Sequence, residues 1–266
     1  MNGKNNKIAL IPARYDSVRF PGKLMQTLGG KSVILQTYLA VTATGLFRQV
    51  AVVTDSPLIY EEIASHGGAV QMSRKQHVCG TDRIAEAIAL YPWADIVLNV
   101  QGDEPFTQAA PLEALLRAME ENASPVAASL MTPINKQEEL QNPNVVKVVT
   151  DKQGYALLFS RAPIPYTPIP APHPNDAAQD LANFAVFGYR HIGVYAFRRE
   201  ALLTFANTEP GPLEIREKLE NLRFLENGMR LKMVEVSSYP KGIDTPENLE
   251  QARRWLLQKS TTHSGL

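Results

Sequence analysis

The chain has 266 residues, of which 44% are hydrophobic, and 27 Lys and Arg balance 27 Asp and Glu to give a formal net charge of zero. A neutral chain has no global basic field, which argues against nucleic acid or an anionic membrane as the main partner. The single cysteine, Cys79, excludes an internal disulfide framework and a cysteine-rich zinc site, and favours a reducing, cytoplasmic setting. We expect no signal peptide and no membrane helix, because no stretch reaches the roughly 20 apolar residues that a span requires. The length suits one large α/β domain or two small ones.

An apolar strand ending in acidic residues is the most informative stretch, ADIVLNVQGDEPF at residues 94–106. Its apolar run predicts a strand buried on both faces. In an open α/β sheet, ligands bind in the crevice outside the carboxyl ends of the strands, so Asp103 is the first functional candidate. Alternatively, Asp103 binds neighbouring N–H groups in a strand-to-helix turn that Pro105 stiffens. This segment alone supports both interpretations equally.

A cation-rich loop follows the first predicted strand. Residues 8–11 form a short β-type run, and the loop after it carries Arg14, Ser17, Arg19 and Lys23. Phosphates bind at this position in α/β folds, where backbone N–H groups, bidentate Arg and a point-charge Lys suit a triphosphate. A solvated charged loop is the alternative. We favour phosphate binding because three cations lie so close to a buried strand.

Two common nucleotide-binding patterns are absent. The stretch GGKS at residues 29–32 resembles the end of a P-loop, but that motif requires glycine where Met25 stands. No GxGxxG follows a predicted strand, which argues against a dinucleotide-binding dehydrogenase. We instead expect the serine of GGKS to cap a helix over residues 33–44, followed by a strand over 50–54 and a helix that starts at Pro57.

A polar loop and a helix N-terminus follow the short strand predicted at residues 69–72. Gly80 permits close backbone approach, and the free donors of the helix start could hold a base or a phosphate. Thr81 as an ordinary helix cap is the alternative, and both stay open. His77 and Cys79 resemble metal ligands, but the sequence has no further cysteine and no suitably spaced histidine, so we do not expect zinc.

The second half of the sequence predicts a mixed sheet. Residues 145–150 and 155–160 flank a DKQG turn, so these strands must be antiparallel. The proline-crowded stretch that follows predicts a long loop, where lids and interfaces tend to occur. Residues 189–197 alternate like a half-buried strand, which places His191 and Tyr195 on one face. For an isolated histidine a structural role is the default.

The C-terminal part predicts two helices and a last strand. Residues 212–228 have the pattern of an amphipathic helix, and residues 231–236 that of a strand. Asp244 or Thr245 caps the final helix, and capping alone would explain Asp244. We expect the polar tail after Gln258 to fray.

Taken together, these stretches resemble the cytidylyltransferases that activate eight- and nine-carbon acidic sugars, most closely those acting on 3-deoxy-manno-octulosonate (Kdo). The family pattern RxxSxRxPGK matches residues 14–23, and NVQGDEP matches residues 99–105 in full. Four further matches are NPNxVKVV, FSRAxIP, an RHIGxYAF-like and a GIDTPEDL-like stretch, at residues 142–149, 159–165, 190–197 and 242–249. The motifs come in the family order over about residues 8–257. This order favours functional roles for Asp103 and His191 over the structural alternatives.

The resemblance implies an α/β fold, a Rossmann-like nucleotidyltransferase or glycosyltransferase-A type mixed sheet flanked by helices, with a smaller sugar-binding and dimerisation subregion. Within one domain it implies a nucleotide-binding half at about 7–131 and a sugar-binding and dimerisation half at about 132–240. A C-terminal helix at 241–258 would return to the core, and 259–266 would form a tail. It also implies a homodimer that makes CMP-Kdo and pyrophosphate from CTP and Kdo for lipopolysaccharide synthesis.

Site roles follow from the same resemblance. The catalytic set is Arg14, Lys23, Asp103 and Asp244, and the two acids are the expected ligands of Mg²⁺. The residues expected at CTP are Arg14, Ser17, Arg19, Lys23, Arg74, Gly80 and Thr81. The residues expected at the sugar acid are Gln101, Arg161, His191, Tyr195 and Glu220. Hard oxygen ligands suit Mg²⁺, which can gather both anionic substrates, so we expect in-line attack without a covalent intermediate.

Two departures from the family patterns concern the base and ribose contacts and the choice of sugar, respectively. The family stretch RxDHxSGT has Gln76 in place of its acid and Cys79 in place of its serine. LEQLR becomes LENLR, with Asn221 one methylene shorter, which leaves room for a related sugar such as amino-substituted Kdo. The alternatives are activation of sialic acid, a glycosyltransferase using a preformed nucleotide sugar, and a non-catalytic regulator. The strand ends in Gly-Asp-Glu where such glycosyltransferases commonly carry Asp-x-Asp. A regulator would have no reason to keep Lys23, Asp103 and Asp244 together.

Overall fold

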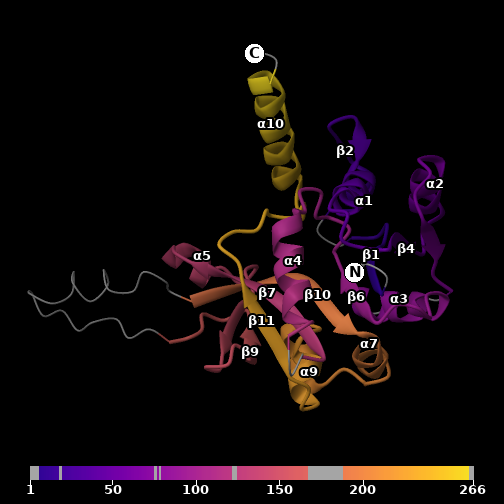
Figure 1. Ribbon diagram of the computed structural model, residues 1–266. Coiled ribbons are helices and arrows are strands. Elements are labelled where there is room, and N and C mark those ends of the chain that lie inside the picture. Colours follow the sequence, from indigo (N-terminus) through magenta and orange to yellow (C-terminus); the bar gives the residue numbers. More distant parts are fainter. Residues whose placement is uncertain are drawn as a thin grey trace, which may run out of the picture. The chain divides into compact units, whose positions relative to one another are not determined.

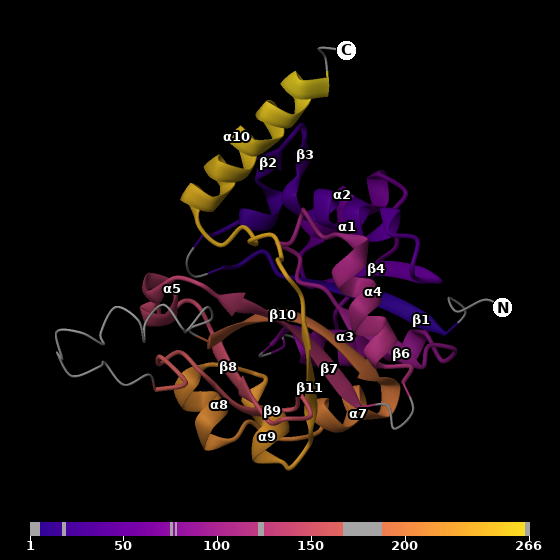
Figure 2. The same cartoon turned by 60° about the vertical axis from the view of Figure 1, so that its left-hand side comes forward.

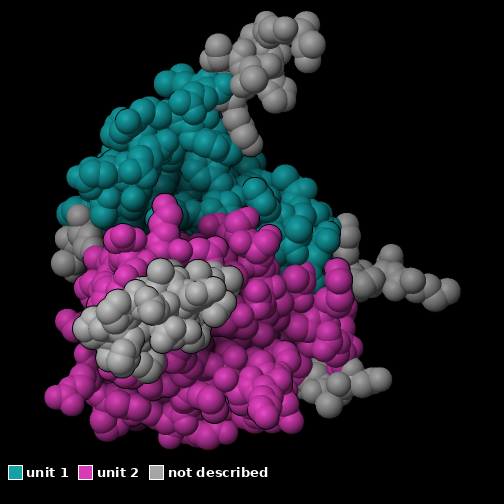
Figure 3. All heavy atoms as spheres, turned by 90° about the vertical axis from the view of Figure 1, so that its left-hand side faces the viewer, with its two compact units in different colours: residues 1–113, 194–206, 240–266 teal, residues 114–193, 207–239 magenta. Residues whose placement is uncertain are grey.

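The structure is a computed structural model that describes residues 6–17, 20–74, 77, 79–121, 125–166 and 188–263. The chain forms two compact units, each assembled from separate stretches of sequence. Figure 3 colours unit 1, residues 1–113, 194–206 and 240–266, and unit 2, residues 114–193 and 207–239. The units therefore differ from the predicted halves: the first boundary lies at residue 113 instead of 131, and residues 194–206 belong to unit 1.

Unit 1 alternates strands and helices, as the sequence predicts (Figure 1). In chain order its elements are β1 (Lys7–Ala13), the 3-10 turn η1 (Lys23–Met25), β2 (Thr27–Leu28), β3 (Lys31–Ser32), α1 (Val33–Ala43), β4 (Gln49–Thr54), α2 (Pro57–Ser65), β5 (Val70–Met72), α3 (Gly80–Ala87), η2 (Ile88–Leu90), β6 (Ile96–Asn99), the start of α4 (Ala109–Ala118), the end of β10 (Gly188–Arg198), α7 (Arg199–Ala206) and α10 (Pro246–His263).

The sheet of unit 1 has the strand order β10-β6-β1-β4-β5. β1 pairs in parallel with β4 on one side and β6 on the other, and only β10 runs antiparallel to its neighbour β6. The chain leaves β1 toward β4 and later returns to the other side of β1 as β6. This reversal is a topological switch point, and ligands of open α/β sheets bind outside the strand ends at such a point.

Both faces of this sheet are covered, which explains why its strands are apolar throughout. β1 and β6 are buried at every position, as predicted for the strand before Asp103. α1 and α2 contact each other and β4, while α3 contacts β1 and α7. Local signals set the helix starts: Ser32 accepts a hydrogen bond from the N–H of Leu35, and Pro57 opens α2 behind its cap Ser56.

Unit 2 is built from short strands and short helices (Figure 2). Its elements are the end of α4, β7 (Ala127–Ile134), α5 (Gln137–Gln141), β8 (Lys147–Thr150), β9 (Ala156–Ser160), the start of β10, α8 (Pro212–Glu217), α9 (Leu222–Glu226) and β11 (Leu231–Glu235).

The strands of unit 2 form a mixed sheet. β11 pairs in parallel with β7, which neighbours β10, and the first half of β10 pairs antiparallel with β8. β8 and β9 are antiparallel across the turn at Asp151 and Gly154, where Gly154 has a φ of 77°. The predicted hairpin is confirmed, and so is the mixed α/β fold.

The helix predicted over residues 212–228 is wrong. The chain forms two short helices, α8 and α9, because Lys218 adopts a left-handed conformation with φ 54°. A left-handed residue cannot continue a right-handed helix. The break leaves Glu220 and Asn221 in a turn between the two helices.

Three smaller expectations need correction. Thr81 does not cap α3, because the N-cap is Cys79 and Thr81 lies buried in the first turn. The sequence pattern predicts a helix over residues 82–91, but α3 ends at Ala87 and continues as the 3-10 turn η2. The backbone of α10 stays helical to His263, beyond the fraying expected after Gln258. The part of the proline-rich loop from residue 167 onward lies outside the described residues.

Among the described residues, no helix is long and apolar enough to cross a membrane.

Candidate active site

The loop after β1 folds back on itself at Gly22. The N–H of Gly22 donates to the carbonyl oxygen of Tyr15 at 3.2 Å, and the φ of Gly22 is 66°. A Cβ atom at this position would lie 3.3 Å from the hydroxyl oxygen of Tyr15. Glycine is therefore required both by the backbone conformation and by the close approach. This turn delivers Lys23 to the carboxyl edge of the sheet.

Lys23 lies between two carboxylates. Its Nζ donates to Oδ2 of Asp103 and, at 2.9 Å, to Oδ1 of Asp244. The side chain of Lys23 is 13% exposed, and those of Asp103 and Asp244 are 19% and 42% exposed. Burial alone would lower the pKa of Lys23, but the two carboxylates outweigh it and raise the pKa above its ordinary value. The structure thus brings together three members of the predicted catalytic set.

Backbone contacts hold Asp244 beside Asp103. The N–H of Ile243 donates to the carbonyl oxygen of Asp103 at 2.8 Å. A Cβ at Gly242 would lie 3.1 Å from that same oxygen. The cap of α10 is Thr245, whose hydroxyl accepts from the N–H of Asn248 at 3.3 Å. Since Thr245 does the capping, the carboxylate of Asp244 faces Lys23 instead.

The start of α3 packs closely against the end of β1. A Cβ at Gly80 would lie 3.0 Å from the ring of Pro12 and 3.6 Å from Oε1 of Gln101. The buried hydroxyl of Thr81 accepts from Asn99 at 3.1 Å, and Gln101 donates to Asn99 at 3.3 Å. The predicted CTP residues Gly80 and Thr81 and the predicted sugar residue Gln101 therefore belong to one hydrogen-bonded group at the switch point.

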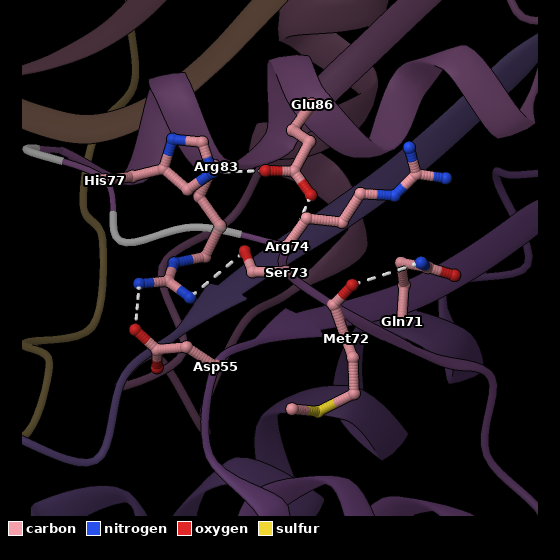
Figure 4. A network of polar contacts seen from close by, with 8 residues as sticks. All are labelled: Asp55, Gln71, Met72, Ser73, Arg74, His77, Arg83 and Glu86. Carbon is pink, nitrogen blue, oxygen red and sulfur yellow. Dashed lines mark hydrogen bonds and ion pairs between the residues drawn. The ribbon is translucent and has the colours of Figure 1, made fainter.

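The segment before α3 is tied to the helix by two side chains (Figure 4). Glu86 accepts from the backbone N–H of Arg74 at 2.7 Å and pairs with Nε2 of His77 at 2.8 Å. Arg83 donates to Asp55 at 2.7 Å and to Ser73 at 3.3 Å. Figure 4 shows the guanidinium of Arg74 pointing away from Asp55 and Arg83. His77 thus pairs with a carboxylate.

The remaining predicted nucleotide residues lie on the loop after β1. Arg14 is exposed directly after the strand, and Ser17 is half-buried. Arg19 lies outside the described residues. Tyr195, predicted at the sugar, belongs to unit 1, where it is buried, stacks on Phe197 and pairs with Asn99 across the sheet.

In unit 2, the predicted sugar residue Arg161 is held by backbone oxygens. Its guanidinium donates to the carbonyls of Glu217 at 2.8 Å and Pro143 at 3.0 Å. The carboxylate of Glu217 accepts from the N–H of Arg161 at 2.9 Å and from the hydroxyl of Ser160 at 2.7 Å. Burial would raise the pKa of Glu217, but these bonds lower it overall. Glu217 was missed because its position in an amphipathic pattern indicates only a solvated helix face.

His191 lies among Ser129, Phe159 and Asn221. Its Nε2 is 2.9 Å from the Oγ of Ser129, and its Nδ1 is 3.4 Å from the Nδ2 of Asn221. Phe159 meets the imidazole edge-on at 5.1 Å. Burial lowers the pKa of His191 to about 3, so the ring is neutral at physiological pH. Glu220, the remaining predicted sugar residue, is half-buried beside Asn221. No sequence signal marks Ser129, which sits inside an apolar strand.

The donor set at Lys23 fits a divalent cation. No group of three or more metal-binding side chains occurs in the described part of the chain. Asp103 and Asp244 nevertheless converge on one cationic nitrogen, which shows that their oxygens can share a single small cation. Two carboxylates suit Mg²⁺, which commonly binds one or two protein carboxylates, substrate phosphates and waters.

Paired acids, a half-buried lysine and close backbone turns at a switch point define an enzyme that transfers a nucleotidyl group, because they can hold a polyphosphate and a cation together. A model of the cytidylyltransferase family matches residues 8–231. The chain therefore belongs to the cytidylyltransferase family and is an enzyme.

Similar proteins extend over nearly the whole chain. It is 53% identical over 251 residues to a 3-deoxy-manno-octulosonate cytidylyltransferase of Flavobacterium johnsoniae, covering 94% of this chain and 98% of the relative. A protein of the same name from Christiangramia forsetii is 48% identical, and the match covers 95% of this chain and 98% of that protein.

Solved structures agree with the fold. The structure of CMP:2-keto-3-deoxy-manno-octonic acid synthetase complexed with CTP matches with a TM-score of 0.84 and 34% identity, over 95% of this chain and 99% of that one. A 4-diphosphocytidyl-2C-methyl-D-erythritol synthase from Anaerococcus prevotii matches with a TM-score of 0.61 at 17% identity, over 96% of this chain and 100% of that one, and shares the fold alone.

Proposed function

We propose that the chain is a Kdo cytidylyltransferase, which transfers CMP from CTP to Kdo and releases pyrophosphate. The observation that carries this proposal is the bridge of Lys23 between Asp103 and Asp244 at the switch point of unit 1. The relatives named for this activity cover nearly the whole chain, and a similar solved structure holds CTP. The product would serve lipopolysaccharide synthesis, and the enzyme would act in the cytoplasm as a homodimer.

The residues of unit 1 divide the work on the nucleotide. Lys23 is released from the two acids and neutralises the negative charge that accumulates on the departing pyrophosphate. Arg14 and Ser17 bind phosphate oxygens from the loop after β1. The N-terminal turn of α3, at Gly80 and Thr81, offers backbone donors to the nucleotide, with Arg74 beside it.

Asp103 and Asp244 would hold Mg²⁺. When bound, the ion supplies charge neutralisation of the triphosphate and lowers the pKa of the sugar hydroxyl. The chain contributes rigid placement of both acids, because Ile243 and Gly242 are packed on the backbone of Asp103. Positioning and charge neutralisation then provide most of the rate for a direct in-line transfer.

The sugar acid would be bound by Gln101, Tyr195, Arg161, His191 and Glu220. Arg161, His191 and Glu220 belong to unit 2. Contacts with Glu217 and Ser129 hold the first two of these side chains in place. Amino-substituted Kdo is the second candidate substrate, because Asn221 is shorter than the glutamine of the family pattern.

The test is pyrophosphate release from CTP and Mg²⁺ with Kdo, beside parallel reactions with amino-Kdo and sialic acid. Release that requires Kdo is expected, and Asp103→Asn should lower kcat by at least about 10²-fold. Asp95→Asn is the matched control, because Asp95 is exposed at the opposite end of the same strand. Release with only amino-Kdo or sialic acid would show a cytidylyltransferase with a different sugar substrate. No release with any of the sugars, from protein shown to be folded, would overturn the proposal.

A further inference from the structure

Three side chains in unit 2, Ser129, His191 and Asn221, form a series of hydrogen bonds in which each group donates to the next. The hydroxyl of Ser129 donates to the main-chain oxygen of Ile192 at 3.1 Å. The same Oγ lies 2.9 Å from Nε2 of His191. A serine hydroxyl has one hydrogen, which is used toward Ile192, so Oγ accepts from the ring. His191 therefore carries its proton on Nε2.

The second ring nitrogen sets the orientation of Asn221. A neutral imidazole with its proton on Nε2 offers Nδ1 as an acceptor. Nδ1 lies 3.4 Å from Nδ2 of Asn221, so the amide nitrogen donates to the ring and the amide oxygen faces elsewhere. This series of donors and acceptors ends at the main-chain carbonyl oxygen of Ile192, which can only accept. Its direction therefore cannot be reversed without breaking a hydrogen bond.

The amide oxygen of Asn221 is left as an acceptor. Asn221 is 2% exposed, and its Oδ1 has no hydrogen-bond partner among the described residues. A buried carbonyl oxygen without a donor is costly, which is why such groups are usually paired. A ligand that brings a hydroxyl or amino group would satisfy it, whereas a carboxylate oxygen would be repelled.

We propose that Ser129 is a positioning residue for the sugar substrate, which locks His191 with its proton on Nε2 and so makes Asn221 an acceptor for a sugar hydroxyl or amino group. This inference rests on the proposed function for its substrate class. It assigns the neutral, donor-bearing part of the sugar acid to Asn221 and excludes the substrate carboxylate from that position.

The first experiment reads the tautomer directly. ¹⁵N-labelled protein, with its five histidines assigned by single substitutions, distinguishes a protonated from a bare ring nitrogen by chemical shift. Wild-type His191 should carry its proton on Nε2, and Ser129→Ala should populate the Nδ1-protonated form. Ser129→Thr keeps the hydroxyl and should restore the wild-type spectrum. A wild-type ring protonated on Nδ1 would overturn the proposal, whether or not the variants fold.

The second experiment separates positioning from general stability. Ser129→Ala should raise KM for Kdo by about five- to tenfold, as expected for one lost buried hydrogen bond, and leave KM for CTP unchanged. Thr132→Val is the matched control, because it removes another buried hydroxyl from the same strand, one that donates to Ser237. The control should change neither constant.

The outcomes distinguish the two proposals. If wild-type protein uses Kdo but Ser129→Ala changes neither the tautomer nor KM for Kdo, the role of Ser129 is wrong and the proposed function stands. If wild-type protein uses no sugar acid, the proposed function and the substrate contact fall together, while the spectra still decide the tautomer.

Discussion

Two groups of opposite charges, one in each unit, make similar contacts in different surroundings. In unit 1, Lys23 bridges Asp103 and Asp244, and the side chain of Asp244 is 42% exposed. In unit 2, Arg223 binds both carboxylate oxygens of Glu214 at 2.7 and 2.8 Å, and these side chains are 2% and 8% exposed. Partly exposed charges can exchange partners at small cost, whereas a buried pair cannot lose one member cheaply. From this difference we expect the charges of unit 1 to serve a ligand and those of unit 2 to serve stability.

Removal of Arg223 should have the largest effect on stability. Arg223→Met leaves the carboxylate of Glu214 buried and unpaired, and should lower the free energy of unfolding by about 3 to 5 kcal/mol. Urea denaturation measures this change. Arg230→Met is the control in the same unit, because Arg230 is 55% exposed in its pair with Asp151, and a loss within about 1 kcal/mol is expected.

The double replacement sharpens the comparison. Arg223→Met combined with Glu214→Leu removes both charges and should recover much of the lost stability. Equal losses in the single and double variants would show that packing of the guanidinium, and not the unpaired charge, is what matters.

Lys147 should have the next largest effect. Its side chain is fully buried, and Nζ donates to the carbonyls of Asn142, Val145 and Arg161 at 2.5 to 3.0 Å. Burial, with Arg161 nearby, lowers the pKa of Lys147. Lys147→Met leaves these carbonyls without their donor and should cost about 2 to 4 kcal/mol of unfolding free energy. The exposed Lys152 of the adjacent turn is the control, and Lys152→Met should be nearly neutral.

His191 extends the comparison to a buried side chain that stays uncharged in the folded protein at neutral pH. Its folded pKa of about 3 lies below the ordinary 6.5, so the unfolded chain binds more protons between these values. Stability should therefore rise with pH across this window, and lowering the pH from 7.5 to 5 should cost at most about 2 kcal/mol through this residue. His191→Gln should flatten the pH dependence, measured by urea denaturation at each pH.

Lys23 should have the smallest effect on stability and a large one on activity. Lys23→Met should change the free energy of unfolding by less than about 1 kcal/mol, because the acids it pairs with reach solvent. Pyrophosphate release should nevertheless fall by at least about 10²-fold. A loss of stability as large as that of Arg223→Met would break the comparison, since Lys23 would then be structural.

The strands of unit 1 were predictable because apolar runs end at residues that sheets avoid. β4 ends directly before Asp55 and β6 ends shortly before Gly102, whereas β1 runs through Pro12 to Ala13 instead of stopping at Ile11. The hairpin of unit 2 was predictable for the same reason, since Gly154 supplies the positive φ that its turn requires.

The break between α8 and α9 could not be predicted from the local pattern. Lys218 carries no signal for a left-handed conformation, and apolar residues continue at helical spacing across it. The cause is tertiary: Glu217 binds Ser160 and Arg161 with its carboxylate and Arg161 with its carbonyl. These contacts outweigh the intrinsic helix propensity of the segment.

Local sequence explained the site only in part. Helix capping alone was enough to explain the presence of Asp244 in the sequence. For Asp103, a ligand-binding role and a role in a strand-to-helix turn were equally supported. Lys23 lies 80 residues from Asp103 and 221 from Asp244, so only the resemblance to a family could place them together in advance. The structure adds that Thr245 takes over the capping. Ser129 and Glu217 had no signal, because a buried hydroxyl and a solvated helix face look ordinary in sequence.

The division of the chain has a consequence for its inheritance. The polypeptide passes between units at four points, and one of them, between Gly193 and Val194, falls inside the continuous strand β10. A single recombination event therefore cannot donate either unit whole to another gene, and an exchange between Gly193 and Val194 would join two halves of one strand. The segments that encode the two units are therefore inherited together, and they diverge together.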